Sequence, residues 1–299
     1  MAVYKKSYRG YDGPLTAGSL RFLAPVRFAF EDLKRSRFLT LFFVASMILP
    51  LAFGCVIWFN HNLSALALLD IKAERLIRID VRFFQHFLGI QCLLAFLWTA
   101  FVGPAMVAPD LANNALPLYL ARPYSRQEYV LSKMTVLLAL LSAVTWAPGL
   151  LLFGLQAYLE GGGWAGENLR IVYGTVFGSW VYIFVLALLA LALSAWVKWK
   201  PVAGALLFGV FFVAAGFGAA VNDILNTRWG HLINLTHLIG TVWNSLFEDQ
   251  AQRGPGAAFF RVRRGEEIPE WSAWLMLAAV CAFCLWMLSR KIRGVEVVR

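Results

Sequence analysis

Charged side chains are scarce in this chain. Asp, Glu, Lys and Arg together make up 15% of the 299 residues, whereas hydrophobic residues make up 60% and the mean hydropathy is +0.65. Soluble globular domains carry about 25% charged residues, so this composition excludes an ordinary soluble protein. The 12 Trp and 9 Tyr residues agree, because amphipathic aromatic rings collect at the boundary between membrane and water. The composition therefore predicts an integral membrane protein.

Several catalytic and nucleotide-binding motifs are also absent. The sequence has no Gly-x-x-x-x-Gly-Lys-Ser/Thr phosphate-binding loop, no Gly-x-Ser-x-Gly nucleophile turn and no His-Glu-x-x-His zinc motif. Each absence excludes one class of activity: ATP binding of that type, serine hydrolysis and zinc proteolysis. We expect the chain to bind no cofactor or metal of its own, and we do not expect it to be an enzyme.

Cysteine is equally sparse. All four cysteines, Cys55, Cys92, Cys281 and Cys284, fall in apolar stretches, where a thiol behaves as a small buried hydrophobic group. Cys281 and Cys284 have the spacing of a metal-binding pair, but no second pair of ligands accompanies them. The cysteines therefore predict packing and no metal centre.

Long hydrophobic runs, by contrast, are abundant. Each of six runs is roughly 19 to 27 residues long, enough to cross about 30 Å of hydrocarbon as a helix. Lipid offers no hydrogen-bond partners, so the backbone of each run must form a helix. We predict an all-α integral membrane protein, a single transmembrane domain over residues 1–299, with spans at 38–59, 88–108, 134–157, 171–197, 201–221 and 271–289.

None of these six predicted spans contains Asp, Glu, Lys or Arg. Transporters driven by protons or sodium ions normally keep ionisable side chains inside the membrane, because buried charge is costly and is retained for function. The absence argues against an ion-driven transporter. It argues equally against an enzyme acting inside the membrane, which needs a polar cluster at depth. Energy for transport would have to come from another source.

The positive charge is unevenly distributed between the two sides of the predicted membrane. Of the 27 Lys and Arg residues, 17 lie in the two termini and the connections on the same side, and 10 lie in the connections on the other side. The richer side is cytoplasmic by the positive-inside rule, which places both termini and residues 109–133 inside. The net charge of +10 flanks the spans, so membrane lipids are the expected partner and nucleic acid is not.

Two segments outside the spans have helical patterns of their own. Residues 18–37 carry apolar residues on one face and cations on the other, which predicts an amphipathic helix in the membrane interface. In the external segment 222–270, residues 231–247 repeat apolar side chains every three or four positions but are too short and polar for a span. We predict a short interfacial or re-entrant helix there, before the last span.

Small residues occur four apart in two spans, with Gly174 and Gly178 in the fourth and Ala214 and Gly218 in the fifth. Such pairs let helix backbones approach closely. The pattern does not distinguish packing within one bundle from packing between two copies of the chain. Kinks are predicted in the first three spans, at Pro50, Pro104 and Pro148.

A polar segment, 109–133, separates the second and third spans. Two prolines, an Asn-Asn pair and a Pro-Tyr-Ser-Arg turn divide it into short pieces. We predict a short helix over 111–120, with Asp110 as its cap, then a turn and a second helix. Ser125 and Glu128 have the spacing of a capping box, which would start that second helix near Ser125.

The order of residues in this segment resembles the loop between spans two and three of ABC-2-type transporter permeases. An acidic residue, a polar pair, Ala-Leu-Pro-Leu-Tyr-Leu and then Arg-Pro-x-Ser-Arg-x-x-Tyr-x-x-x-Lys follow one another as in that family. One departure is Asp110, where many members have Glu. In the family this loop carries a coupling helix, which seats in a groove of a separate ATP-binding subunit.

The resemblance implies an ATP-driven exporter in the plasma (inner) membrane. Its working unit would hold two permease chains, identical or paralogous, and two ATP-binding subunits that bind ATP and Mg. The expected contacts with the ATP-binding subunit are Asp110, Leu116, Leu118, Tyr119, Leu120, Arg122, Pro123, Arg126, Glu128 and Tyr129.

Alternatives remain open at this point. The loop could instead cap spans two and three at the lipid headgroups, with its arginines as membrane anchors. The chain could also be a non-transport membrane protein that anchors or assembles a soluble partner. Spans without charge are compatible with lipids, amphipathic drugs, polymers or peptides, so the sequence does not determine the substrate.

Overall fold

The computed structural model describes residues 22–62, 77–113, 115, 125–197, 199–247, 262 and 268–292. Within these ranges every regular element is a helix. Six helical stretches are long and apolar enough to cross a membrane: Arg37–Asn60, Val81–Ala112, Arg126–Glu160, Leu169–Trp196, Lys200–Leu225 and Glu270–Lys291. The all-α, six-span fold class predicted from the sequence is confirmed.

Three of the spans are single helices and three are composite. The single helices are α2 (Arg37–Asn60), α10 (Leu169–Trp196) and α14 (Glu270–Lys291). The second span joins α4 (Val81–Val102) to α5 (Pro104–Ala112), the third joins α7 (Arg126–Val144) to α8 (Trp146–Glu160), and the fifth joins α11 (Lys200–Phe208) to α12 (Ala214–Leu225) through the π-helical turn η3 (Gly209–Val213). The shorter elements are α1 (Leu23–Arg35), α9 (Trp164–Glu167), the 3₁₀ turn η4 (Trp229–Ile233) and α13 (Leu235–Phe247).

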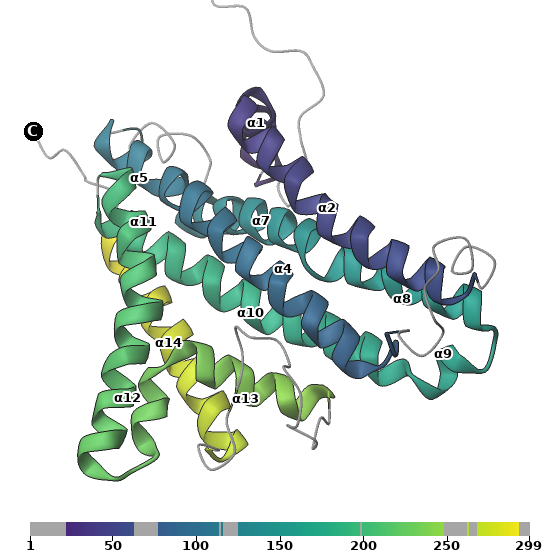
Figure 1. Ribbon diagram of the computed structural model, residues 1–299. Coiled ribbons are helices and arrows are strands. Elements are labelled where there is room, and N and C mark those ends of the chain that lie inside the picture. Colours follow the sequence, from purple (N-terminus) through teal and green to yellow (C-terminus); the bar gives the residue numbers. More distant parts are fainter. Residues whose placement is uncertain are drawn as a thin grey trace, which may run out of the picture.

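Helix α10 lies at the centre of the bundle. It packs against α4, α5, α7 and α8 on one side and against α13 and α14 on the other (Figure 1). In the most apolar part of α10, 67% of the residues are buried, against 11% for α2 and 22% for the α11–α12 stretch. Helices α2, α11 and α12 therefore present most of their apolar surface outward, as spans at the rim of a membrane bundle do.

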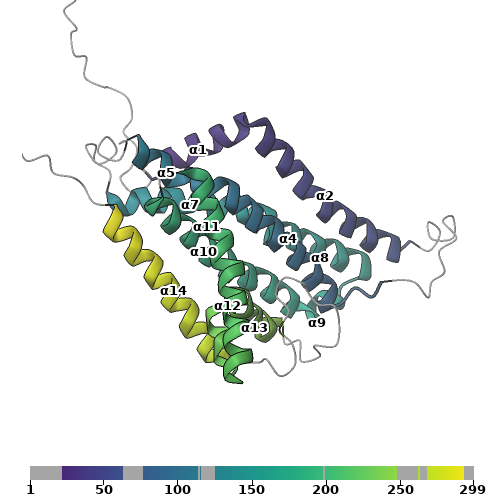
Figure 2. The same cartoon turned by 60° about the vertical axis from the view of Figure 1, so that its left-hand side comes forward.

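The bundle has two distinct ends (Figure 2). One end, here called the α1 end, holds α1, the last turn of α5, the first turns of α7 and α11, and the end of α14. The opposite α9 end holds α9 and the starts of α4 and α10. The predicted loop between spans two and three thus leaves and re-enters the bundle at the α1 end.

Proline interrupts two of the spans. Pro104 has no N–H to continue the helix, so α4 ends at Val102 and α5 begins at Pro104. Gly103 is required at this break, because a Cβ there would lie 2.7 Å from the Ala190 Cβ.

The second interruption separates α7 from α8 at Thr145. Helix α7 ends at Val144, whose carbonyl lies four residues before Pro148 and would meet the proline ring in a continuous helix. Helix α2, in contrast, continues through Pro50 as one helix.

Helix α4 begins seven residues before the predicted limit of its span. Asp80 starts it, because its Oδ1 accepts hydrogen bonds from the backbone N–H groups of Arg82 (3.0 Å) and Phe83 (3.2 Å). Phe84 and Phe87 in the added turns are fully buried. Because Arg82 is charged, the hydropathy of the sequence placed the start of this span after the true start of the helix.

The N-terminal helix α1 is amphipathic, as predicted. Val26 is buried, and Ala29, Phe30 and Leu33 pack against the core of the bundle. The Arg27 and Arg35 side chains on the outer face are 83% and 80% exposed. Helix α1 contacts α7 and α2, so it lies across the start of the first span.

Residues 229–247 fold back onto the bundle before the last span. The turn η4 runs beside α12, and α13 then packs between α10 and α14. Leu238, Ile239 and Val242 on α13 are fully buried. The short helix predicted before the last span is therefore present, and it is largely buried inside the chain.

At the α9 end, His61 ties the end of α2 to the end of α8. His61 Nε2 lies 2.7 Å from Glu160 Oε2, and Nδ1 lies 2.9 Å from the Ile57 carbonyl oxygen. Burial lowers the pKa of His61, but the hydrogen bonds to the Ile57 carbonyl and to the Glu160 carboxylate outweigh it, so the net pKa is raised. Both ring nitrogens face acceptors, an arrangement that the imidazolium form satisfies.

Candidate functional site

At the α1 end, three side chains hold the last turn of α5 against the first turns of α7. The Tyr129 hydroxyl donates a hydrogen bond to Asp110 Oδ2 at 2.8 Å, and Lys133 Nζ lies 2.9 Å from the same oxygen. Lys133 Nζ also lies 5.5 Å from the centroid of the Tyr129 ring. Tyr129 is buried, and the Lys133 and Asp110 side chains are 15% and 18% exposed. We call Asp110, Tyr129 and Lys133 the loop clamp.

Asp110 lies in the last turn of α5, so the prediction that it caps the start of a helix is wrong. A carboxylate at this end faces the negative end of the helix dipole, which is unfavourable. The Lys133 ammonium offsets that repulsion, and charge-assisted hydrogen bonds are stronger than neutral ones. Asp110 therefore serves as the joint between α5 and α7.

Helix α7 starts as predicted. Ser125 Oγ accepts a hydrogen bond from the Glu128 N–H at 3.2 Å, and Glu128 Oε2 accepts one from the Ser125 N–H at 2.6 Å. This confirms the capping box. Arg126, at the first helical position, is exposed. The other residues predicted to contact an ATP-binding subunit lie outside the described residues, namely Leu116, Leu118, Tyr119, Leu120, Arg122 and Pro123.

Ser194 ties α5 to the central helix α10. Its hydroxyl accepts hydrogen bonds from the N–H groups of Val107 (3.2 Å) and Ala108 (2.9 Å) and donates one to the Pro104 carbonyl (3.1 Å). Val107 and Ala108 are the fourth and fifth residues of α5, so the Ser194 hydroxyl adds a hydrogen-bond partner from a second helix to the first turn of α5. Helix α5 is thus held by α10 through Ser194 and by α7 through the loop clamp.

Gly174 and Gly178 of α10 form a seat for α13. A Cβ at Gly174 would lie 2.6 Å from the Phe247 ring, and one at Gly178 would lie 3.0 Å from Trp243 Nε1. The Trp243 indole N–H donates a hydrogen bond to the Gly178 carbonyl at 2.8 Å. The missing side chains at both positions let two large aromatic rings lie directly on the α10 backbone.

A second close contact joins α12 to η4. The backbones of Gly218 and Gly230 touch, and Asn222 Oδ1 accepts a hydrogen bond from the Gly230 N–H at 2.7 Å. Ala214 lies one turn before Gly218 and is partly exposed. The contacts of Gly174, Gly178 and Gly218 are therefore made within one chain.

The sequence reasoning missed two residues of this framework. Lys133 follows Tyr129 by four residues, the spacing that places two side chains on one helix face. This spacing could have predicted that Lys133 lies beside Tyr129. Ser194 carried no local signal, because it is a single hydroxyl in an apolar helix and its amide partners lie 86 and 87 residues away. Among the described residues, no group of three or more His, Cys, Asp or Glu is placed to hold a metal ion.

The sequence of this six-span bundle, with its loop clamp and its short helix before the last span, was compared with known families. The family model of the ABC-2 family transporter protein matches residues 62–289, most of the chain. The chain belongs to this ABC-2 transporter family. A comparison with curated proteins gives no match.

As a member of the ABC-2 family, the chain is a multi-pass membrane protein and a permease subunit of an ABC transporter. ABC-2 permeases are transport subunits and typically work with an ATP-binding subunit. The matched range begins after α2 and ends within α14, so it includes the loop clamp, Ser194 and the seat of α13.

Proposed function

We propose that this ABC-2 permease belongs to an ATP-driven exporter and couples to its ATP-binding subunit through residues 109–133. The loop clamp is the observation that carries the proposal. One side chain before the loop, Asp110, bonds two side chains after it, Tyr129 and Lys133, at 2.8 and 2.9 Å. A force on the loop would therefore move α5 and α7 together, as one rigid joint.

A connected path runs from this joint to the other end of the bundle. Ser194 bonds α5 to α10, and the Gly178 carbonyl bonds α10 to Trp243 on α13. Packed and hydrogen-bonded elements of this kind can carry coupling between distant sites. Closure of two ATP-binding subunits, which would hold ATP and Mg, would rock two permease bundles between inward-facing and outward-facing states.

The energy source and the sidedness support the same proposal. The six spans predicted from the sequence contain no Asp, Glu, Lys or Arg, which disfavours coupling to a proton or sodium gradient. The α1 end carries the larger share of Lys and Arg, so we place it and both termini in the cytoplasm, where an ATP-binding subunit works. Export across the plasma membrane is the direction that resemblance to ABC-2 permeases implies.

The test is purification of the tagged full-length chain from its native membrane in mild detergent, with quantification of every co-purifying protein. We expect a stoichiometric subunit that carries a phosphate-binding-loop lysine. The double variant Tyr119→Ala and Arg126→Ala should release that subunit or stop permease-dependent stimulation of its ATP turnover. Arg228→Ala, which removes a cation after α12 at a distance from the loop, is the matched control and should change neither.

Two outcomes would overturn the proposal. One is a preparation without an ATP-binding subunit under conditions that keep other transporter complexes intact. The other is a double variant that retains the subunit and its stimulated ATP turnover in full. In either case the anchoring function, in which the loop recruits a different soluble partner, would take its place.

A further inference from the structure

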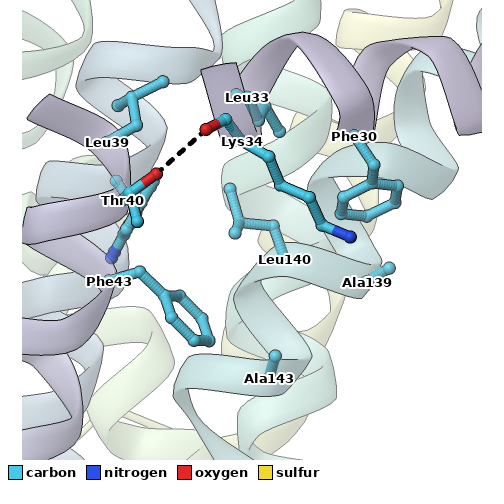
Figure 3. Close-up of a pocket in the computed structure, with 10 residues that line it drawn as sticks. Phe30, Leu33, Lys34, Leu39, Thr40, Phe43, Ala139, Leu140 and Ala143 are labelled. Atoms are coloured by element: carbon cyan, nitrogen blue, oxygen red, sulfur yellow. Dashed lines mark hydrogen bonds between the residues drawn. The ribbon is translucent and has the colours of Figure 1, made fainter. Parts of the chain in front are cut away.

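A cavity of about 270 Å³ lies where α1 crosses α2 and α7 (Figure 3). Helix α1 contributes Phe30 and Lys34 to its wall, α2 contributes Phe43, and α7 contributes Leu140 and the two small residues Ala139 and Ala143. The volume is slightly below the roughly 300 to 1,000 Å³ of typical small-molecule pockets. It suits part of a chain-like ligand and leaves the remainder outside.

The chain builds this space from local features. Ser36 ends α1 and starts α2, with its Oγ accepting a hydrogen bond from the Leu39 N–H at 3.4 Å. Thr40 Oγ1 then donates to the Lys34 carbonyl at 3.2 Å, which fixes the angle between the two helices. On α7, residues 139 and 143 are one turn apart on the same face, and their small side chains leave the space open.

The charge at the rim of the cavity is positive. Lys34 lines the cavity, and Figure 3 shows its side chain extending toward Phe30. Lys34 and Arg37 stand on either side of the Ser36 turn, and neither has an ion-pair partner among the described residues. The neighbouring Arg27 and Arg35 each pair with an acidic residue on α1. The two unpaired cations are therefore available to an anion from outside the chain.

The cavity lies at one end of the first span, close to the expected membrane surface. It lies beside the first turns of the first span, the level at which lipid headgroups meet hydrocarbon. Phe38 and Leu41 of α2 are exposed large apolar residues at the same level of the helix, as expected for a segment inside the membrane. An apolar wall that includes the unpaired cation Lys34, with Arg37 three residues further along the chain, is complementary to an acyl chain with a negatively charged headgroup.

We propose that this cavity is a binding site for an anionic phospholipid. The acyl chain occupies the space between Phe43, Leu140 and Ala143, and the phosphate lies against Lys34, with Arg37 beside it. Such a lipid fills the gap under α1 and joins that helix to α2 and α7. The site is separate from the loop clamp and does not depend on the partner that binds the loop.

The test uses photoactivatable phosphatidylglycerol, with a diazirine in its acyl chain, in vesicles that contain the full-length chain. We expect adducts on peptides from α1, α2 and α7 that line the cavity. Lys34→Gln should lower labelling about fivefold, the effect of one cation near an anionic surface, while Arg35→Gln should not. Ala143→Phe, or the smaller change Ala139→Leu, should abolish labelling by filling the space, while Ala45→Phe on the exposed part of α2 should not.

The same probe with a phosphatidylcholine headgroup separates the anionic lipid from any other amphiphile. Weak labelling by this neutral probe, unchanged in Lys34→Gln, supports the proposal. Equal labelling by both probes in the unaltered chain would overturn it, and so would full labelling of both cavity-filling variants. Displacement of the anionic probe by an equal concentration of a neutral amphiphile would also overturn it, because the cavity would then bind transported or adventitious apolar molecules without regard to charge.

Discussion

The Tyr129 hydroxyl and the Asp110 carboxylate meet across 2.8 Å at the base of the loop between the second and third spans. The same carboxylate oxygen lies 2.9 Å from the Lys133 ammonium, so one oxygen serves two partners from α7. Loss of the carboxylate therefore removes both contacts, whereas loss of the hydroxyl removes one. A variant that lacks the Asp110 carboxylate should therefore lose more stability than one that lacks the Tyr129 hydroxyl.

Tyr129→Phe is expected to lower the free energy of unfolding by about 1.5 kcal/mol, because it removes a hydrogen bond to a charged group. Asp110→Ala is expected to cost more, because it also leaves the Lys133 ammonium largely buried without its partner. Thermal unfolding in detergent measures both. Tyr158→Phe is the control, because that side chain is 84% exposed. If Tyr129→Phe and Tyr158→Phe lowered the stability equally, the Tyr129 hydroxyl would not stabilise the fold through Asp110.

Ser194→Ala is expected to destabilise the protein by about 1 to 3 kcal/mol, because it removes a buried hydroxyl that bonds two N–H groups and one carbonyl of α5. The melting temperature should fall by several degrees, and the loss should exceed that of Ser142→Ala on α7. Amide hydrogen exchange should rise at Val107 and Ala108 in the Ser194 variant. Unchanged exchange at these two amides would show that the hydroxyl does not hold the first turn of α5.

Gly174→Ala is expected to loosen α13, because the new methyl group would lie 2.6 Å from the Phe247 ring and the ring must move. Gly154→Ala on α8 is the matched control, since a Cβ there meets nothing within 4 Å and alanine favours a helix. The first variant should lower the melting temperature and the second should keep or raise it. The same response in both variants would mean that the glycine has no packing role.

The contact between His61 and Glu160 predicts a pH-dependent stability. The raised pKa of His61 means that the folded state holds its proton more tightly than the unfolded chain, whose histidine has a pKa of about 6.5. The stabilisation is therefore complete below that value and is lost as the pH rises through the raised pKa of the folded state.

His61→Gln should accordingly lower the melting temperature most at about pH 6 and least at alkaline pH. The measurement is a series of thermal unfolding curves against pH for both proteins. His86→Gln, at an exposed histidine beside Phe53, serves as the control. A difference between the wild-type and His61→Gln proteins that stays constant with pH would exclude a charged His61.

The proposed orientation predicts which ends of the bundle react with a membrane-impermeant thiol reagent in intact cells. Gly162→Cys, between α8 and α9, should react, whereas Ser125→Cys, at the start of α7, should react after the cells are opened. The unaltered chain with its four cysteines gives the background. The reverse pattern would place the loop clamp outside and remove the ATP-binding subunit from its reach.

Local patterns in the sequence predicted much of the scaffold. Six apolar runs without charge gave six spans, Pro104 and Pro148 lie at the two proline breaks, and the spacing of Ser125 and Glu128 gave the capping box. The limit of the second span was less accurate, because Arg82 carries a charge in a helix that is held by buried phenylalanines. The role of Asp110 was misjudged, because a cap and a side-chain partner require the same residue type.

Composition, hydropathy and turn chemistry act over a few neighbouring residues, and for that reason the sequence by itself determined the membrane class, the number of spans and the start of α7. The tertiary structure alone decided which distant groups meet: Asp110 with Tyr129, Ser194 with the amides of α5, and Trp243 with the Gly178 carbonyl. These contacts depend on how whole helices rotate and slide against each other to satisfy polar groups away from water, and no local pattern specifies that choice.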